Sequence, residues 1–293
     1  MTIETVIINC STKEQTTLAL VSALQHGRLP VTVIDCQSTD GSNAFFEQLQ
    51  HRLPFRLEQM PLRRHGASLD RIFNTTTSDA LLLLDSDAEI LHDDLVPQLV
   101  AALDADSYGS GFLQGGTWLS SNHLVAGRIG YYAPRMWIPC VLLKVAPVRA
   151  ALRAGQSFRG RVVGNEIARL PWLSQLLYLR FRLPVLRRMT LDVLRPLRGS
   201  YFGAQPHYVY YDTGAMLHDH LLNEQRLRFA DLGADYFGTA VRHYHGVTRR
   251  RLHRHMRNAA DVNKTRDEAI ERIETIYGAA VPELKSPPRR GAD

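Results

Sequence analysis

Several kinds of residue and segment are scarce in this chain, and each scarcity excludes a class of protein. The 293 residues contain three cysteines, Cys10, Cys36 and Cys140, which are odd in number and lack metal-ligand spacing. Neither a disulfide framework nor a zinc finger is therefore expected, and reduced thiols are the simpler interpretation. The sequence has no charged leader with an apolar core and no run of about 18 apolar residues that would span a bilayer. We expect a cytoplasmic protein, either soluble or peripheral at the inner face of the membrane.

Apolar runs alternate with helical patterns through the first 110 residues. The runs at 5–9, 31–34, 55–58 and 80–84 have the character of strands, and helical spacing follows each of the first three. Strands that alternate with helices predict a parallel sheet. Such sheets bind ligands at the carboxyl ends of their strands, so polar residues at these ends should meet at one edge. These residues are Asn9, Cys10, Ser11, Asp35, Asp85, Ser86 and Asp87.

The acidic pair Asp85 and Asp87 is the strongest of these signals. Four leucines, 81–84, lead directly into it. Because strand residues two apart share a face, both carboxylates can converge on one hard divalent ion while Ser86 points away. The alternative is a solvated turn after a buried strand.

These features resemble the family 2 glycosyltransferases. The segment 33–42, Val-Ile-Asp-Cys-Gln-Ser-Thr-Asp-Gly-Ser, is similar to the family's D-x-x-S-x-D-G-[ST], and 81–87 is similar to its hydrophobic-D-x-D. The resemblance implies the GT-A fold: a mostly parallel, Rossmann-like α/β sheet flanked by helices, with an elaborated helical carboxyl half. It implies a nucleotide-sugar-binding half over 1–115, an acceptor-binding and catalytic half over 116–281 and, from the composition, a disordered tail over 282–293.

The resemblance also implies roles for the strand-end residues. The residues from Asn9 through Cys10 to Ser11, together with Asp35, would line the nucleotide pocket, and Asp85 with its neighbour Ser86 would lie near the ribose. Asp87 would coordinate a Mg²⁺ or Mn²⁺ that bridges the diphosphate of a nucleotide-diphosphate sugar donor. Cys36 stands where many members have an acid or amide that can read the base, so the identity of the base stays open.

Two further residues lie near the same predicted edge. Arg64, in the basic loop 63–65 before a helix, suits contact with the diphosphate or the sugar, although paired arginines on a loop are often merely solvated. Asp70 lies one helical turn further on. In the family this helix packs beside the donor sugar, which makes Asp70 a candidate for a sugar hydroxyl contact.

The second half of the chain should provide the acceptor site and a general base. Trp137 suits stacking on the acceptor, and an ordinary core position is its alternative. An inverting transferase needs a carboxylate that takes the proton of the acceptor hydroxyl. Asp212, between an aromatic strand-like run and a helix over 215–222, is the first candidate; a helix cap is its alternative, and Asp219 is the reserve. The family's usual Glu-Asp pair is missing at this junction.

Two late histidines, His243 and His245, lie on one face of an extended segment. The resemblance implies that a late histidine followed by glycine completes the metal shell, and His245 with Gly246 fits this pattern better than His243. A neutral imidazole beside oxygen ligands suits Mn²⁺.

Lysine is scarce as well: four lysines stand against 31 arginines in a chain of net charge +6. The segment 169–198 has seven arginines interleaved with leucines and aromatics. It suits peripheral contact with an anionic membrane, a lid or a homodimer contact. Nucleic acid is not expected as a partner, because the chain lacks a recognition helix or stacking motif and places its main acidic cluster at the ligand edge.

Together these features predict a metal-dependent glycosyltransferase, inverting by resemblance. It would move a sugar from its nucleotide donor to a hydroxyl acceptor, which is a glycan, a lipid-linked glycan or a small molecule. Two alternatives stay open. A catalytically silent GT-A-like domain would bind sugar nucleotides or act in assembly. A nucleotidyltransferase would be expected to have a glycine-rich basic loop after the first strand, and residues 9–14 are not one.

Overall fold

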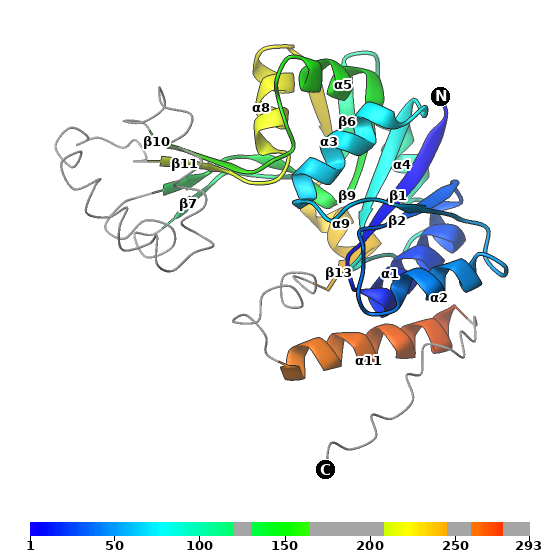
Figure 1. Cartoon of the computed structure of the whole chain (residues 1–293). Coiled ribbons are helices and arrows are strands. Elements are labelled where there is room, and N and C mark those ends of the chain that lie inside the picture. Colours follow the sequence, from blue (N-terminus) through cyan, green and yellow to red (C-terminus); the bar gives the residue numbers. More distant parts are fainter. Residues whose placement is uncertain (120–129, 165–207, 245–258, 278–293) are drawn as a thin grey trace, which may run out of the picture.

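The computed structural model describes residues 1–119, 130–164, 208–244 and 259–277. A seven-stranded sheet with the order β12-β6-β9-β4-β1-β2-β3 forms its centre (Figure 1). All neighbours pair in parallel except β9, which runs antiparallel to β4 and β6. The strands are β1 (Ile3–Asn9), β2 (Val31–Asp35), β3 (Arg56–Gln59), β4 (Ala80–Asp85), β6 (Ser107–Gln114), β9 (Arg135–Lys144) and β12 (Arg228–Asp231). The predicted α/β class with a mostly parallel sheet is confirmed.

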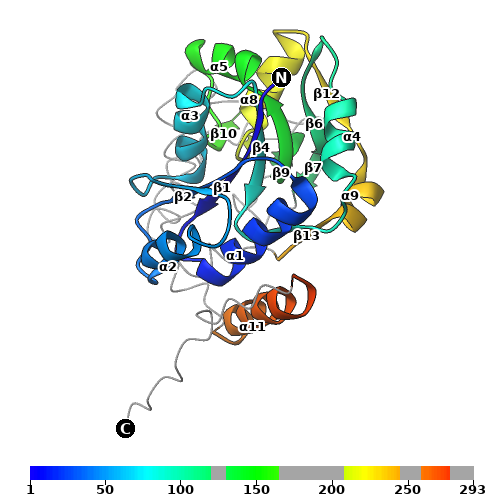
Figure 2. The same cartoon turned by 90° about the vertical axis from the view of Figure 1, so that its right-hand side faces the viewer.

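Helices cover both faces of this sheet and create two cores (Figure 2). The first core contains α1 (Lys13–Ser22), η1 (Ala23–Gly27), α2 (Ser42–Leu49), α4 (Leu95–Ala101), α9 (Ala234–Ala240) and α11 (Ala259–Ile276). The second contains α3 (His65–Thr75), α5 (Val145–Arg153) and α8 (Ala215–Asn223). None of the helices in the described ranges is long and apolar enough to cross a membrane.

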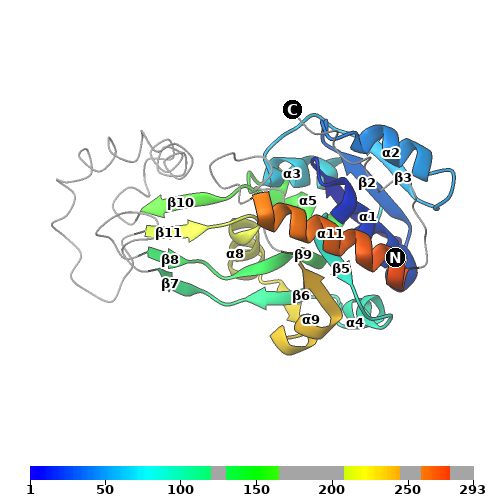
Figure 3. The same ribbon diagram turned by 90° about the horizontal axis from the view of Figure 1, so that it is seen from below.

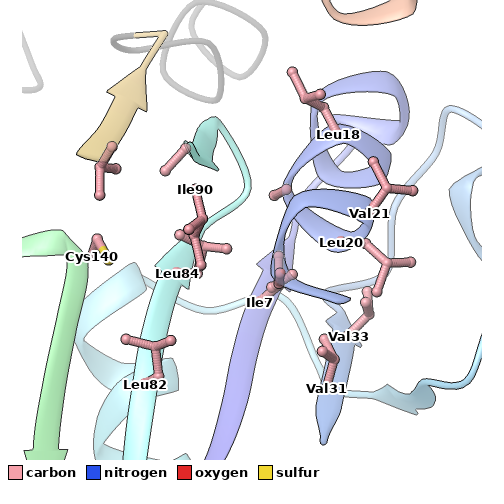
Figure 4. Packing of buried hydrophobic residues seen from close by; sticks show 14 of the residues in the cluster. Ile7, Leu18, Leu20, Val21, Val31, Val33, Leu82, Leu84, Ile90 and Cys140 are labelled. Atoms are coloured by element: carbon pink, nitrogen blue, oxygen red, sulfur yellow. The ribbon is translucent and has the colours of Figure 1, made fainter. Parts of the chain in front are cut away.

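Burial on both faces explains the leucine run before the acidic pair. Leu82 and Leu84 of β4 face the first core, where Ile7 of β1 and Leu18 of α1 also lie (Figure 4). Leu81 and Leu83 belong to the second core. A strand covered on both sides needs apolar residues at every position, so the run has no alternation.

A four-stranded sheet with the order β10-β11-β8-β7 extends from the main body (Figure 3). It continues two strands of the main sheet, because β7 follows β6 and β8 precedes β9 along the chain. Its strands are β7 (Thr117–Leu119), β8 (Gly130–Tyr132), β10 (Arg161–Gly164) and β11 (Tyr208–Tyr211).

Two short strands form a third sheet near the strand ends of the main one. β5 (Ala88–Ile90) follows β4 after a turn and pairs antiparallel with β13 (Val241–His243). Helix α11 packs along α1 and carries two buried residues, Ala269 and Ile273, into the first core. Figures 1 and 3 show α11 lying across this end of the molecule.

The four strands expected at 5–9, 31–34, 55–58 and 80–84 and the helices expected after the first three are all present, with ends displaced by a few residues. The strand-like run before Asp212 and the helix over 215–222 also form the expected elements, β11 and α8. Local sequence patterns do not predict β5, β7, β8, β10, β12, α5, α9 or α11.

Gly66 lets α3 approach the chain before β10. A Cβ at Gly66 would lie 2.6 Å from the carbonyl oxygen of Phe158 and 2.7 Å from backbone atoms of Arg159. Gly66→Ala should therefore destabilise the fold by about 1–3 kcal/mol, despite the better helix propensity of alanine, because backbone must move.

Gly238 in α9 provides the matched control, since a Cβ there would meet nothing within 4 Å. Gly238→Ala should be neutral or stabilising by up to about 1 kcal/mol. Urea unfolding midpoints of the two variants measure the difference. Equal midpoints for Gly66→Ala and wild type would contradict the close packing.

Candidate active site

The polar strand ends meet at one edge of the main sheet. β1 is hydrogen-bonded to β2 on one side and to β4 on the other, all in parallel. Asn9 lies opposite Asp35, and Ile8 lies opposite Asp85. The register therefore brings the ends of all three strands to the same level, as the sequence predicts.

A candidate metal centre forms where β4 ends. One ligand atom from each of Asp85, Asp87 and His243 lies within 4.8 Å of the others. Nε2 of His243 is 3.2 Å from Oδ1 of Asp87, whose side chain is 8% exposed. Two carboxylates suit Mg²⁺ or Mn²⁺, and an imidazole beside them suits Mn²⁺, so these residues fit such an ion.

The two acids converge by a different route from the expected one. β4 ends at Asp85, and Ser86 and Asp87 lie in the turn before β5 rather than in a continuing strand. The turn buries Ser86 and Asp87. The backbone of Asp87 is held by the residue directly after β13, because the amide of Tyr244 donates to the carbonyl of Asp87 at 2.8 Å.

His243 is the late histidine that the described part of the chain brings to the acids, whereas the sequence pattern favours His245. His245 lies outside the described residues, so its role stays a prediction. His243 is placed by β13, where it lies opposite Ala88 of β5. Because β13 has three residues, its pattern of polar and apolar side chains is too short to indicate this partner from the sequence.

Asn9 organises the loops after β1 and β2. Its Nδ2 donates to Oδ1 of the buried Asp35 at 2.6 Å and to Oγ of Ser38 at 3.0 Å. The amide of Ser38 donates to Oδ2 of Asp35 at 3.1 Å. Ser11 and Gln37 have left-handed φ angles of 54° and 53°. Such conformations are unfavourable for these residue types and often occur at binding sites.

Arg64 and His65 begin α3 beside this edge. Arg64 is the N-cap residue and is exposed. Nε2 of His65 lies 3.7 Å from Oδ1 of Asp85. The amino terminus of α3 therefore lies next to Asp85, where the first backbone amides of the helix and Arg64 suit an anion.

Asp70 is engaged with the chain before β10. Oδ2 accepts a hydrogen bond from Oγ of Ser157 at 2.6 Å, and Oδ1 accepts one from the amide of Phe158 at 2.8 Å. Arg159 lies 3.5 Å away. Through these contacts Asp70 holds the chain before β10 against α3. Its contact with a sugar stays a prediction.

Asp212 lies between the main sheet and the extended one. Tyr132 donates to its Oδ2 at 2.6 Å, Tyr210 donates to its Oδ1 at 3.3 Å, and Arg135 lies 3.2 Å from Oδ2. The two hydroxyl donors and the positive charge of Arg135 stabilise the ionised carboxylate. Burial and the Asp212 carboxylate together raise the pKa of Tyr132, which keeps it a donor at neutral pH. The reserve candidate, Asp219, is exposed and accepts a hydrogen bond from Asn223.

Trp137 of β9 packs against the first core. Its ring makes edge contacts with Phe237 and His243, with centroid distances of 5.9 and 5.5 Å. The contact supports the orientation of His243, and stacking on an acceptor stays a prediction.

The segment 169–198, considered for membrane or dimer contact, and the tail over 282–293 lie outside the described residues.

Residues 5–115 match the model of the glycosyl transferase family 2. The resemblance drawn from the strand-end motifs is confirmed for this part of the chain. The matched residues include Asn9, Asp35, Asp85 and Asp87, and exclude Asp212 and His243.

Solved structures align over part of the chain. S. aureus TarS 1–349 has 16% identity over 52% of this chain and 49% of its own, with a TM-score of 0.36. Mannosyltransferase PcManGT from Pyrobaculum calidifontis, solved with GDP-Man and Mn²⁺, has 14% identity over 51% and 46%, with a TM-score of 0.40. Apo-form GlyE of Streptococcus pneumoniae TIGR4 has 13% identity over 78% and 45%, with a TM-score of 0.37.

The chain thus spans about half the length of these solved structures. No curated protein matches it.

The thiols at the strand ends allow a test of this edge. Cys10, Cys36 and Cys140 are all buried and free. Burial, with smaller contributions from Cys10 and Asp35, raises the pKa of Cys36 to about 12. An unfolded thiol ionises near pH 8.5, so the unfolded chain loses this proton first, and the contribution of Cys36 to stability falls as pH rises from about 8.5 to about 12.

Because the thiolate is the reactive form, Cys36 should resist iodoacetamide in the native protein at about pH 9 and react readily in urea. Mass spectrometry of the Cys36 peptide measures the labelling. Equally fast labelling in the native and unfolded protein would show that the strand end is open.

Proposed function

We propose that the protein is a metal-dependent, inverting glycosyltransferase that moves a sugar from a nucleotide-diphosphate sugar to a hydroxyl acceptor. The observation that carries this proposal is the convergence of Asp85, Asp87 and His243 at the sheet edge that also holds Asn9 and Asp35. The family match over residues 5–115 supports it.

The described residues divide into a donor side and an acceptor side. On the donor side, Asp87, Asp85 and His243 would hold a Mn²⁺ or Mg²⁺, which supplies Lewis-acid stabilisation of the leaving diphosphate. Asn9 and Asp35 are proposed to contact the nucleotide after their loops adjust, because Asp35 is 2% exposed. The amino terminus of α3 adds amide donors for phosphate oxygens.

On the acceptor side, Asp212 is proposed as the general base. The acceptor oxygen attacks the anomeric carbon, the bond from that carbon to the diphosphate oxygen breaks, and Asp212 takes the hydroxyl proton. One of its present donors, Tyr132 or Tyr210, must yield its place to the acceptor hydroxyl. Attack on the face of the anomeric carbon opposite the leaving group inverts the configuration of that carbon.

Binding of nucleotide sugars with and without Mn²⁺ tests the proposal. UDP- and GDP-sugars form the first panel, because TarS has been solved with UDP-GlcNAc and PcManGT with GDP-Man. A ligand at 100 times its Kd stabilises the folded state by about 2.7 kcal/mol, which raises Tm measurably. We expect one donor to raise Tm only with Mn²⁺ present, and Asp87→Ala to abolish this rise while keeping the Tm of the apo protein.

Product analysis then separates the alternatives. Transfer to water or to an acceptor, detected as released nucleoside diphosphate, supports a transferase. Binding without release would indicate a silent sugar-nucleotide-binding domain. A Tm rise that is the same in wild type and Asp87→Ala would contradict the metal centre.

Asp212→Asn should lower kcat by roughly 10²–10⁴-fold with the donor KM unchanged, because the amide oxygen can still accept one of the two tyrosine hydrogen bonds but the side chain cannot take a proton. Steady-state kinetics measures both constants. Asp219→Asn, on the neighbouring helix and exposed, is the control and should keep wild-type rates. Wild-type turnover of Asp212→Asn would assign the base elsewhere.

A further inference from the structure

Glu89 is a buried carboxylate that the proposed chemistry does not use. It is the middle residue of β5 and is 0% exposed. Its two oxygens accept four hydrogen bonds. Arg272 donates through Nε and Nη2, both at 2.7 Å, Tyr244 donates at 2.8 Å, and Tyr277 donates at 2.7 Å.

These donors make burial of Glu89 depend on the docking of α11. Arg272 lies in α11 and Tyr277 directly after it. A charged carboxylate is very unfavourable in an apolar interior unless it is paired and hydrogen-bonded. Without α11, Glu89 would keep only the hydroxyl of Tyr244 among these donors. The two-point contact from a planar guanidinium also fixes orientation, which a single point charge does not.

Glu89 and its partner Tyr244 are close in the chain to two residues of the candidate metal centre. Glu89 is two residues after Asp87, and Tyr244 directly follows His243. The hydrogen bond between Tyr244 and Glu89 therefore joins the segments that carry Asp87 and His243. The backbone bond from Tyr244 to Asp87 joins the same segments.

The sheet that carries these segments is not part of the main ladder. β5 and β13 form their own two-stranded sheet in the described part of the chain. The main sheet fixes Asp85 through β4, but it does not by itself fix Asp87 and His243 relative to Asp85. Trp137 of β9 contacts the ring of His243, and the other restraints come from outside the ladder. These are α11 and Ser22 of α1, whose hydroxyl accepts from the amide of Ile90 at 3.1 Å.

We propose that Arg272, by binding Glu89, is a positioning residue that holds Asp87 and His243 at the distance from Asp85 at which one divalent cation is bound. This inference rests on the proposed metal-dependent function and deepens it. Helix α11 is then a part of the metal centre that acts through a hydrogen-bonded carboxylate rather than by ligation. Mutation of groups that orient metal ligands typically weakens metal binding by roughly 10–100-fold.

A second ion pair of α11 provides the matched control. Nε of Arg266 donates to Oε1 of Glu14 of α1 at 2.9 Å, and Glu14 is 4% exposed. This pair also joins α11 to the core through a buried carboxylate, but Glu14 is in α1 and remote in the chain from the candidate ligands. Loss of either pair should loosen α11, whereas only the loss of Arg272 should affect the metal.

The experiment compares Mn²⁺ binding by the full-length protein and its variants, followed through the EPR signal of free Mn²⁺ with UDP or GDP present. The variants are Arg272→Gln, Arg266→Gln and Asp87→Ala. A double variant, Glu89→Gln with Arg272→Gln, removes both charges together, so that no unpaired carboxylate is left buried if the single variant fails to fold. Circular dichroism and Tm establish that each variant is folded at the temperature of the titration.

We expect the Arg272→Gln and double variants to bind Mn²⁺ roughly 10–100-fold more weakly than wild type, and Arg266→Gln to bind it with wild-type affinity at a comparable loss of Tm. Wild-type affinity in the folded double variant would overturn the positioning role and leave the metal centre intact. Equal weakening by Arg266→Gln would also overturn it, because any loosening of α11 would then suffice. If Asp87→Ala bound Mn²⁺ as wild type does, the metal centre itself would fail, and this inference with it.

Discussion

Parallel hydrogen bonding of β1 to β2 and to β4 is the constraint on which the candidate active site depends. It sets Asn9 level with Asp35 and Ile8 level with Asp85. Polar residues that are 26 and 76 positions apart in the chain therefore share one edge. The apolar side chains of these strands are buried on both faces, so a slip of the register would expose core residues and is strongly disfavoured. The loops after the strands can therefore carry polar and strained residues without disturbing the pairing of the strands.

The candidate metal centre combines this rigid frame with a second element. Asp85 belongs to the main sheet, whereas His243 comes from the two-stranded sheet behind the turn at Asp87. Such an arrangement has two parts whose relative position decides whether the ligands converge. Trp137 beside His243 and the hydrogen bonds of Glu89 both restrain the second part. The acceptor side, around Asp212, depends in turn on β11 and on Arg135 at the start of β9.

The sequence predicts the first half of the fold well, because each strand there ends in polar residues and most are followed by helical spacing. It places Asp85 and Asp87 correctly at the edge, although the turn at Ser86, rather than strand alternation, brings them together. The pairing of β5 with β13 is not predictable from local patterns, since each has three residues and its partner is about 150 positions away. Choosing His243 over its neighbour requires that pairing. The contacts of Asp70 likewise join residues 87 and 88 positions apart.

Anomalous diffraction from crystals grown with Mn²⁺ and a nucleoside diphosphate tests the central claim most directly. We expect a manganese peak in contact with Asp87 and His243, with the diphosphate beside it and the nucleotide directed toward Asp35. A peak elsewhere on the protein, or a nucleotide bound away from the carboxyl ends of β1, β2 and β4, would contradict it.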